Sequence, residues 1–396
     1  MAVGIIAEYN PFHNGHLYHL QKVKEMFPNE EIILVMNGNF TQRGEPAIID
    51  KWKRSEMAIE ASIDLVVELP YPFATQSADF FSYGAVTLLE KLKVDKFVFG
   101  SETGDISLLE EIVNAQLYCK DFDPLVKIYM KLGENYPTAL SKALNDLTGK
   151  SLKLPNDLLG ISYVKAIKKN NYKIKPYCIK RENNYHDKNN KSVITSATSI
   201  REALINKEDI SLSIPTFVNK YLNDLHFQED YFKFLKYKIL LEKNLSIYQT
   251  VDEGLSSKIK KEIVEATSYK DLIEKLKSRR YTYSNLNRML NHILCGFTKE
   301  LAIECQKIEY IRVLGFNEVG QRYLGKIKKE VDIPILTNYS KNHSKMLELE
   351  FQSSCCYAST LDEVKKTELI KKEYQYHPKY KEKMSNEKNE VPTTGT

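Results

Sequence analysis

The chain opens on a strand-to-helix corner that reads Ile5-Ile6-Ala7-Glu8-Tyr9-Asn10-Pro11-Phe12-His13-Asn14-Gly15-His16. Residues 3–7 form the short apolar run of a buried strand, Asn10-Pro11 ends it, and apolar residues recur at helical spacing from Gly15 onward. A helix N-terminus offers unpaired N–H groups and partial positive charge to an anion, and a glycine there lets a ligand approach the backbone. The sequence therefore predicts a phosphate site at this corner.

His13 and His16 lie one helical turn apart, so their rings can face the same ligand. Both can donate hydrogen bonds to phosphoryl oxygens as charge develops there. For a lone histidine, a surface or capping role would be the simpler interpretation. His-x-Gly-His at the end of a first buried strand, however, resembles the signature of the HIGH-type nucleotidyltransferases, which join ATP or CTP to an acceptor and release pyrophosphate.

Length and composition favour a two-domain globular protein. The chain has 396 residues, of which 42% are hydrophobic and 28% charged. No apolar run approaches the roughly 20 residues that cross a bilayer. The first strand follows Met1 directly, without the basic and apolar regions of a signal peptide. We therefore expect a cytoplasmic protein without a membrane partner.

The six cysteines are scattered and form no Cys-x-x-Cys pair. No histidine stands at metal-ligand spacing from any of them. We expect reduced, mostly structural cysteines and no protein-held metal site.

Apolar strand-like runs at residues 3–7, 32–36, 65–69 and 97–100 alternate with amphipathic segments. This alternation predicts a Rossmann-like parallel-sheet α/β domain over residues 1–212, with its ligand crevice outside the carboxyl ends of the strands, where strand order reverses. From about residue 214 the strand signal disappears and long helical patterns follow. We expect an α-helical C-terminal domain at 213–373 and a disordered charged tail at 374–396.

The net charge of +5 comes from the C-terminal half. Residues 231–330 hold 20 basic and 12 acidic side chains, with aromatic residues interleaved, and residues 165–191 hold nine basic and two acidic ones. Such stretches can neutralise phosphates and stack unpaired bases. Solvated helix faces explain the composition equally well.

A second candidate phosphate site is Ser196-Ala197-Thr198-Ser199-Ile200-Arg201. Ser199 and Glu202 have the spacing of a capping box, while hydroxyls and an arginine at a helix start can also hold triphosphate oxygens. The run resembles the Ser-Ser-Thr-x-Ile-Arg signature that accompanies His-x-Gly-His in the same superfamily. Ala197 replaces one serine, whereas Thr198 and Arg201 are retained.

Longer segments are similar to the bacterial tRNA(Met) cytidine acetate ligase family: residues 4–19, 39–47, 68–74, 77–79, 99–102, 155–160, 279–282 and 313–317. The resemblance implies a two-step reaction. Acetate attacks the α-phosphate of ATP to give acetyl-adenylate and pyrophosphate, and the wobble cytidine of elongator tRNA(Met) then takes the acetyl group to give N4-acetylcytidine. Acetate is already a nucleophile at neutral pH, so the first step can rest on positioning and charge stabilisation.

The resemblance also implies site residues. The catalytic candidates, which stabilise charge on ATP, are His13, His16 and Arg201. The expected ATP contacts are Ile6, Ala7, Glu8, Tyr9, Asn10, Pro11, Phe12, His13, Asn14, Gly15, His16, Leu17, Tyr18, His19, Gly100, Asn156, Arg181 and Thr198. A plain turn is the alternative for Gly100, and a helix cap for Asn156. Mg²⁺ is inferred from the triphosphate substrate alone.

The candidates for holding RNA are Arg279, Arg280, Tyr281, Tyr283 and Arg288. The loop at 39–44 combines amide, hydroxyl and guanidinium groups at a strand end, so we expect acetate or the target cytosine near it. Two other interpretations stay open at this point. One is an adenylyltransferase for a small phosphorylated metabolite, and the other is a non-catalytic RNA-binding module. The oligomeric state is not indicated.

Overall fold

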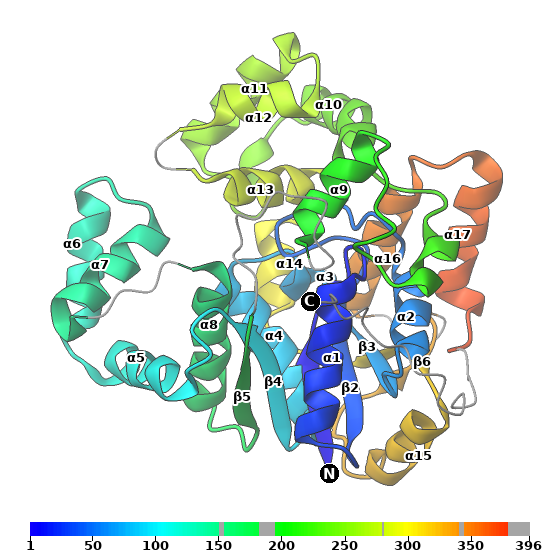
Figure 1. The fold of residues 1–396 in the computed structure, drawn as a ribbon. Coiled ribbons are helices and arrows are strands. Elements are labelled where there is room, and N and C mark those ends of the chain that lie inside the picture. The colour runs from blue at the N-terminus through cyan, green and yellow to red at the C-terminus, as the bar shows by residue number, and fades with distance from the viewer. Residues whose placement is uncertain (150–153, 182–194, 279–280, 340–343, 379–396) are drawn as a thin grey trace.

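The computed structural model describes residues 1–149, 154–181, 195–278, 281–339 and 344–378. Within these ranges a seven-stranded sheet runs through the centre of the molecule, in the order β5-β4-β1-β2-β3-β6-β7 (Figure 1). The strands are β1 (Ala2–Ile6), β2 (Glu31–Asn37), β3 (Leu65–Leu69), β4 (Lys96–Ser101), β5 (Lys175–Lys180), β6 (Ile311–Phe316) and β7 (Ile335–Leu336). The first five strands are parallel, whereas β6 is antiparallel to β3 and parallel to β7. The predicted α/β fold is confirmed, and β1 to β4 match the four predicted strands to within one residue at each end.

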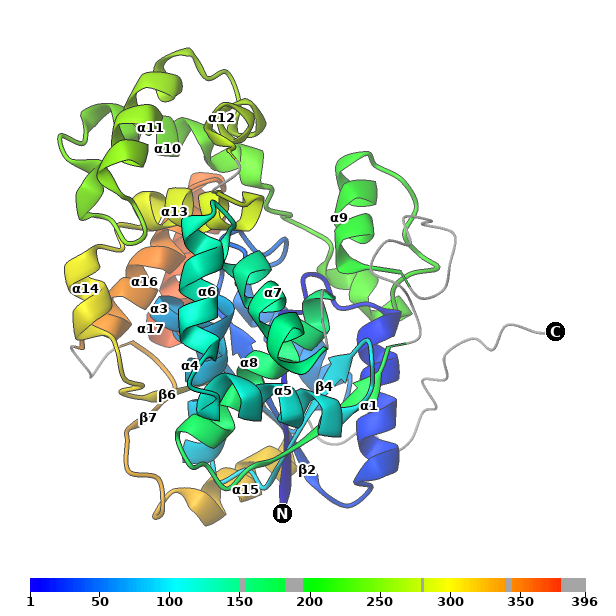
Figure 2. The same cartoon turned by 90° about the vertical axis from the view of Figure 1, so that its left-hand side faces the viewer.

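Helices cover both faces of this sheet (Figures 1 and 2). One face carries α1 (Asn14–Met26) and α2 (Lys51–Glu60), and the other carries α4 (Ala78–Lys91) and α8 (Pro155–Lys169). The other elements of the N-terminal half are α3 (Tyr71–Ala74), α5 (Ile106–Tyr118), α6 (Phe122–Lys131), α7 (Tyr136–Thr148), α9 (Ala197–Ile205) and the short 3-10 helix η1 (Thr216–Tyr221).

Strand β2 shows how the sequence builds these two layers. Ile33 and Val35 pack into the core beneath α4, while Ile32, Leu34 and Met36 pack into the core beneath α1 and α2. Successive side chains of a strand point to opposite faces, so a strand covered on both sides needs an unbroken apolar run.

Strand order reverses at β1, because β2 and β3 follow on one side while β4 and β5 lie on the other. In open α/β sheets ligands bind outside the carboxyl ends of the strands at this point. The histidine corner follows β1 and Gly100 lies near the end of β4. The fold therefore places both at the switch point.

The prediction that strands are absent after residue 214 is wrong. β6 pairs with the β3 edge of the sheet, and β7 extends it. Arg312 is the second residue of β6, and its charge is typical of a surface segment. In the structure Arg312 is fully buried and forms ion pairs with Glu68 and Glu373, which makes a charge tolerable there.

The helical region between η1 and β6 has a hydrophobic core of its own. It contains η2 (Gln228–Tyr231), α10 (Phe232–Leu241), η3 (Leu245–Ile247), α11 (Glu253–Glu265), α12 (Tyr269–Leu276), α13 (Tyr283–Cys295) and α14 (Lys299–Glu304). These helices lie beyond the carboxyl edge of the sheet (Figure 1). The helical domain expected at 213–373 is thus interrupted by two strands, and the division after residue 212 stays a prediction.

The last helices return to the sheet and carry the ordered chain past residue 374. They are α15 (Glu318–Ile327), α16 (Lys345–Ala358) and α17 (Glu363–Gln375). The ring of Tyr376 lies 4.4 Å from the fully buried indole of Trp52, centroid to centroid. The structured part therefore extends beyond the expected start of the tail, and residues 379–396 lie outside the described ranges.

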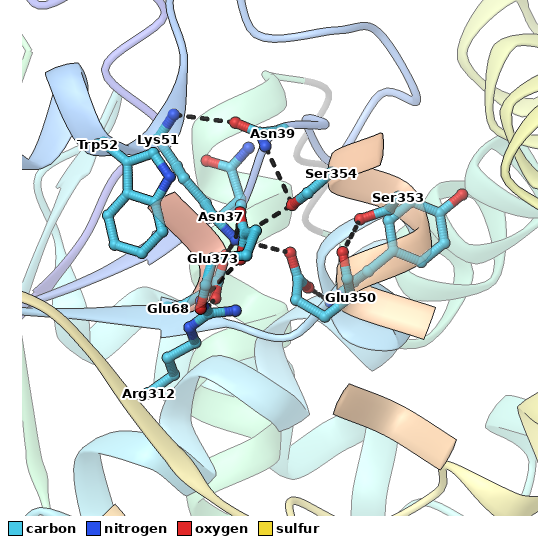
Figure 3. Close-up of polar contacts among 12 residues, drawn as sticks. Asn37, Asn39, Lys51, Trp52, Glu68, Arg312, Glu350, Ser353, Ser354 and Glu373 are labelled. Atoms are coloured by element: carbon cyan, nitrogen blue, oxygen red, sulfur yellow. Dashed lines mark hydrogen bonds and ion pairs between the residues drawn. The ribbon is translucent and has the colours of Figure 1, made fainter. Parts of the chain in front are cut away.

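A buried ion cluster joins α16 and α17 to the sheet (Figure 3). The Lys51 Nζ atom lies 2.7 Å from Glu68 Oε1, 3.0 Å from Glu373 Oε1 and 3.4 Å from Glu350 Oε1. Burial and the neighbouring Glu68 carboxylate raise the pKa of Glu350 to about 8. With Glu350 protonated, two carboxylates face Lys51 and Arg312, so the charges balance.

This cluster also fixes the loop after β2. The Lys51 main-chain N–H donates to Asn39 Oδ1 at 2.9 Å, and the Asn39 amide donates to Ser354 Oγ at 3.2 Å. Arg54 donates from its guanidinium to the carbonyl oxygens of Gly38 and Ile49. Across the ranges given above, no helix is long and apolar enough to cross a membrane.

Candidate active site

A cleft opens at the carboxyl ends of β1 and β4. It is lined by Ile6, Ala7, Glu8, Tyr9, Asn10, His13, Gly15, His16, Tyr18, His19, Phe99, Gly100, Asn156, Leu159, Tyr163, Ile179, Lys180, Arg181, Ala197 and Arg201. The structure therefore brings together the histidine corner, the start of α9 and the expected ATP contacts near residues 100, 156 and 181. These segments are far apart in the sequence.

Five residues expected to contact ATP do not line this cleft: Pro11, Phe12, Asn14, Leu17 and Thr198. Phe12 and Leu17 are buried in the core with α1 and α2. Helical periodicity turns Leu17 inward, whereas Phe12 lies just before the helix. The Asn14 amide donates to the Leu212 carbonyl at 2.9 Å and anchors α1 to that loop. These side chains hold the corner in place.

His13 and His16 form a stacked pair at the start of α1. Their ring centroids are 3.7 Å apart with an interplanar angle of 29°. His13 is the N-cap, and its Nδ1 accepts from the Gly15 N–H at 3.0 Å. The His16 Nδ1 accepts from the His13 N–H at 3.2 Å. The two rings thus form a reciprocal capping box.

These contacts determine what the rings offer to a ligand. An Nδ1 atom that accepts a hydrogen bond carries no proton, so each neutral ring carries its proton on Nε2. Burial, with the nearby Arg181 and Arg201, lowers the pKa of His13 to about 3. Burial and the His13 ring lower the pKa of His16 well below its usual value. Both residues are therefore neutral Nε2–H donors at physiological pH.

The N–H groups of the first helical turn are already paired, contrary to the expectation of free donors. The Asn14 N–H donates to the Ser213 carbonyl at 3.1 Å, and the His16 N–H donates to the His13 carbonyl at 2.9 Å. The Gly15 N–H is taken by His13, as described above. An anion at this corner is therefore met by the imidazole donors rather than by the backbone.

His19 lies one turn further along α1 and lines the same cleft. Its Nε2 atom is buried and has no hydrogen-bond partner in the structure. Burial and Arg181 lower the pKa of His19 to about 4. A buried polar atom without a partner indicates a position that a ligand completes.

Asn156 and Arg181 face each other across the end of β4. The Asn156 amide donates to Glu102 Oε1 at 2.6 Å, and Asn156 Oδ1 accepts from Arg181 Nη1 at 3.4 Å. A Cβ atom on Gly100 would lie 3.4 Å from Arg181 Cγ, so the arginine side chain covers this glycine. Because both ends of the Asn156 amide are occupied, the residue here positions Arg181 and Glu102.

The start of α9 supplies the cation on the opposite wall. Ser196, not Ser199, is the N-cap: its Oγ accepts from the Ser199 N–H at 3.1 Å. The expected capping box at Ser199 and Glu202 is wrong because the helix begins three residues earlier. Arg201 donates from Nη1 to the Asn10 carbonyl at 2.9 Å, and its Nη2 lies 3.5 Å from Glu45 Oε2. Arg201 is thereby aimed at the histidine corner.

An apolar wall was missed by the sequence analysis. It consists of Phe99, Leu159, Tyr163 and Ile179, next to Lys180 at the end of β5. Strand-end and helix residues of this kind look like ordinary core residues in the sequence. Ile179 and Lys180 pair in register with Gly100 and Ser101, and this register is visible in the structure but not in the sequence.

The loop at 39–44 reaches the cleft through Gln42. Its main-chain N–H donates to Glu8 Oε1 at 2.7 Å, and its side-chain amide donates to the Gln76 carbonyl at 2.7 Å. Asn39 and Thr41 are buried. The placement of acetate or cytosine near this loop stays a prediction.

The expected RNA-binding residues flank the same loop from the helical region. A Cβ atom on Gly44 would lie 2.5 Å from the Arg288 main-chain nitrogen, so α13 packs directly against the loop. Tyr283 is exposed at the start of α13, whereas the Tyr281 hydroxyl donates to Asp252. Burial lowers the pKa of Arg288 to about 10. Arg279 and Arg280 lie outside the described residues.

Among the residues for which coordinates are described, no group of three or more His, Cys, Asp or Glu side chains could hold a metal ion. The site therefore lacks a protein cage for Mg²⁺ in this part of the chain. Any Mg²⁺ would be held chiefly by phosphate oxygens and water, as is usual for this ion.

Comparison with known proteins places the chain in a family. Residues 1–373 match the family model described as HIGH Nucleotidyl Transferase. The tRNA(Met) cytidine acetate ligase of Geobacillus sp. (strain WCH70) is 41% identical over 396 residues, which covers 95% of this chain and 99% of the relative. The chain belongs to the tRNA(Met) cytidine acetate ligase family. The Bacillus subtilis (strain 168) member of that family is 37% identical over 402 residues, with 95% and 96% of the two chains covered.

Solved structures of the tRNA(Met) cytidine acetate ligase family extend this match to three dimensions. The apo structure of Thermotoga maritima TmcAL superposes with a TM-score of 0.89 at 30% identity and covers 97% of this chain and 100% of that chain. The same protein bound with alpha-thio ATP superposes with a TM-score of 0.87 at 31% identity, with the same coverage. A close structural relative thus binds an ATP analogue.

Proposed function

We propose that this protein joins acetate to the wobble cytidine of elongator tRNA(Met) at the expense of ATP. The observation that best supports this proposal is the stacked pair His13 and His16. The pair presents neutral Nε2–H donors to a cleft that also contains Arg181 and Arg201. Such fixed donors stabilise negative charge on a phosphoryl group without activating a nucleophile. Family membership over 95% of the chain supports the ligase activity.

In the first step an acetate oxygen attacks the α-phosphorus and pyrophosphate leaves. The charge that develops on the phosphates meets His13, His16 and His19 on one side and Arg181 and Arg201 on the other. Mg²⁺ accompanies ATP, bound to the phosphates and water. In the second step the cytidine N4 atom attacks the acetyl carbon and AMP leaves.

The tRNA reaches this cleft from the side of α13. The anticodon loop is unpaired, so its wobble base can be turned into a pocket at modest cost. Tyr283 is exposed at the start of α13, and Arg288 follows on the same helix beside the loop at 39–44. With Arg279, Arg280 and Tyr281 they form the proposed RNA-contacting set.

The test is incubation of the protein with ATP, labelled acetate and total tRNA, followed by nucleoside analysis. Label is expected in N4-acetylcytidine of tRNA(Met). Label in no RNA, with AMP transferred to a phosphorylated metabolite and pyrophosphate released, would favour the adenylyltransferase interpretation. ATP turnover that is unchanged in His16→Ala would favour the non-catalytic RNA-binding module.

A further inference from the structure

The cleft contains a carboxylate that the binding of ATP does not explain. Glu8 follows β1, lines the cleft and is the only carboxylate among the described residues that do so. A negative side chain beside a triphosphate opposes binding through like-charge repulsion. Its presence among His13, Arg181 and Arg201 therefore calls for a separate role.

Glu8 is held firmly on one side and free on the other. Its Oε1 accepts from the Gln42 N–H at 2.7 Å, and its main-chain carbonyl accepts from Arg54 Nη1 at 2.7 Å. Oε2 accepts no hydrogen bond in the described structure, and the side chain is only half-buried. One carboxylate oxygen is thus available to a bound substrate.

The frame that holds Glu8 is rigid. Arg54 is fully buried, and its remaining guanidinium atoms donate to the carbonyls of Ile49, Asn37 and Gly38. The loop carrying Gln42 is tied to the ion cluster through Asn39 (Figure 3). A carboxylate fixed by main-chain contacts on both sides keeps its direction while substrates exchange.

The acetyl-transfer step requires an oxygen that can accept a proton. The exocyclic amine of cytosine is conjugated with the ring, so its nitrogen is a weak nucleophile that becomes positive when it attacks a carbonyl. It must lose a proton as the new bond forms, and a positioned base accelerates such transfers by about 10²–10⁴-fold. Burial raises the pKa of Glu8, partly offset by the Gln42 hydrogen bond and by Arg43, Arg201 and Arg54, which brings the carboxylate closer to the range of an effective base.

We propose that Glu8 is the general base of the acetyl-transfer step, which rests on the proposed function. The cytidine N4 atom forms a bond to the acetyl carbon, and the proton on N4 passes to Glu8 Oε2. The bond from the acetyl carbon to the phosphate oxygen breaks, and its electron pair leaves with AMP. Glu8 removes no proton in the first step, because acetate carries none to remove.

The experiment separates the two steps in the full-length protein. Acetate-dependent exchange of labelled pyrophosphate into ATP, without RNA, reports adenylate formation. Single-turnover transfer from preformed acetyl-adenylate to a tRNA(Met) transcript reports the second step. Glu8→Gln keeps the acceptor for the Gln42 N–H and removes the base. We expect transfer to fall at least about 100-fold and exchange to change less than about 3-fold.

Two further variants and a pH profile test the assignment. Glu8→Asp should recover part of the transfer rate. Glu25→Gln removes a negative charge from the exposed end of α1, where Glu25 pairs with Lys22 outside the cleft, and should leave transfer within about 3-fold of wild type. The wild-type transfer rate should rise with pH to a plateau, and this titration should vanish in Glu8→Gln.

Three outcomes would overturn the assignment. Wild-type transfer in Glu8→Gln would mean that AMP or water takes the proton. A parallel loss of exchange and transfer would place Glu8 in ATP binding. An equal loss in Glu25→Gln would reduce the effect to general electrostatics. Absence of acetate-dependent exchange in the wild-type protein is a distinct result that would contradict the proposed function itself, and this assignment with it.

Discussion

At the level of single residues, the two histidines of the corner depend on their mutual packing and capping for their orientation. Each Nδ1 atom accepts a backbone N–H, which fixes both rings and leaves Nε2–H as the group that faces the cleft. Because both rings are neutral, they add no charge repulsion to each other despite a centroid separation of 3.7 Å. They act as directed donors.

Two substitutions of His16 separate the roles of its nitrogens. In Gln the amide nitrogen can occupy the place of Nε2, whereas in Asn the amide oxygen can replace only the capping acceptor at Nδ1. We expect His16→Asn to slow acetate-dependent pyrophosphate exchange about 10²–10³-fold, the usual effect of losing one fixed donor. His16→Gln should retain more activity. The reverse order would show that capping, and not donation to phosphate, is the essential role.

The sequence reveals the histidines but not how they are paired. The motif and its position after a strand predict a phosphate site at the switch point, and the structure places both rings there. The first-turn N–H groups donate to Ser213 and His13. Ser213 belongs to a loop about two hundred residues away, so the spacing of the motif does not indicate this pairing. The apolar wall of Phe99 and Tyr163 was missed because its residues are indistinguishable from core.

At the level of elements, β6 and α17 depend on one buried arginine. Arg312 Nη2 lies 2.7 Å from Glu373 Oε2 and 3.3 Å from the Glu373 carbonyl, and its Nε lies 3.5 Å from Glu68 Oε2. The periodicity of the sequence predicted β1 to β4 well because apolar residues dominate those strands and helical segments separate them. It could not predict β6, since the partners that neutralise Arg312 come from distant elements.

Removal of this arginine should loosen both elements. Arg312→Met leaves the buried carboxylates of Glu68 and Glu373 with Lys51 but without Arg312, so one negative charge is unbalanced and we expect the free energy of unfolding to fall by about 3–5 kcal/mol. Amide hydrogen exchange in α17 should accelerate. Lys326→Met is the matched control, because Lys326 is 69% exposed and its pair with Glu31 should contribute less than about 1 kcal/mol. Equal effects of the two changes would contradict a special role for the cluster.

The segment between α12 and α13 carries the proposed RNA contacts. The double variant Arg279→Glu and Arg280→Glu should weaken tRNA binding at least about tenfold, because phosphate neutralisation dominates such affinities. Acetate-dependent pyrophosphate exchange should stay intact. Binding is measured by filter retention at fixed salt concentration.

A second double variant provides the control for that experiment. Lys328→Glu and Lys329→Glu make the same charge change just after α15, at the opposite end of the molecule from the helical region (Figure 1). They should leave tRNA binding within about twofold of wild type. Equal loss of binding and exchange in the Arg279 and Arg280 variant would contradict the assignment of this segment to RNA.

At the level of the whole molecule, buried histidines make stability depend on pH. Burial lowers the pKa of His13 to about 3 and those of His19, His226 and His292 to about 4. Between these values and about 6.5 the unfolded chain binds protons that the folded chain does not, so stability falls as pH falls through this window. Glu350 and Glu8 oppose this trend, because their raised pKa values mean that the folded chain holds protons that the unfolded chain releases.

We therefore expect the free energy of unfolding to decrease from pH 6.5 towards pH 4, by about 1.4 kcal/mol per pH unit for each net proton. Urea titrations at several pH values measure this slope. His226→Asn, away from the cleft, should reduce the slope by about one proton. A stability that is constant or rising towards pH 4 would contradict the neutral state of these rings.

The return of β6 and β7 to the sheet affects the order in which the protein can fold during its synthesis on the ribosome. The nucleotide-binding half emerges first, with Lys51 and Glu68 in place and the edge of β3 open. Arg312, Glu350 and Glu373 follow only after the helical region has been made. The nascent chain must keep that edge solvated while the helical region is made, and the sheet closes only after β6 and β7 have left the exit tunnel. A fragment that stops before residue 311 would therefore be an unfinished protein rather than a smaller catalytic one.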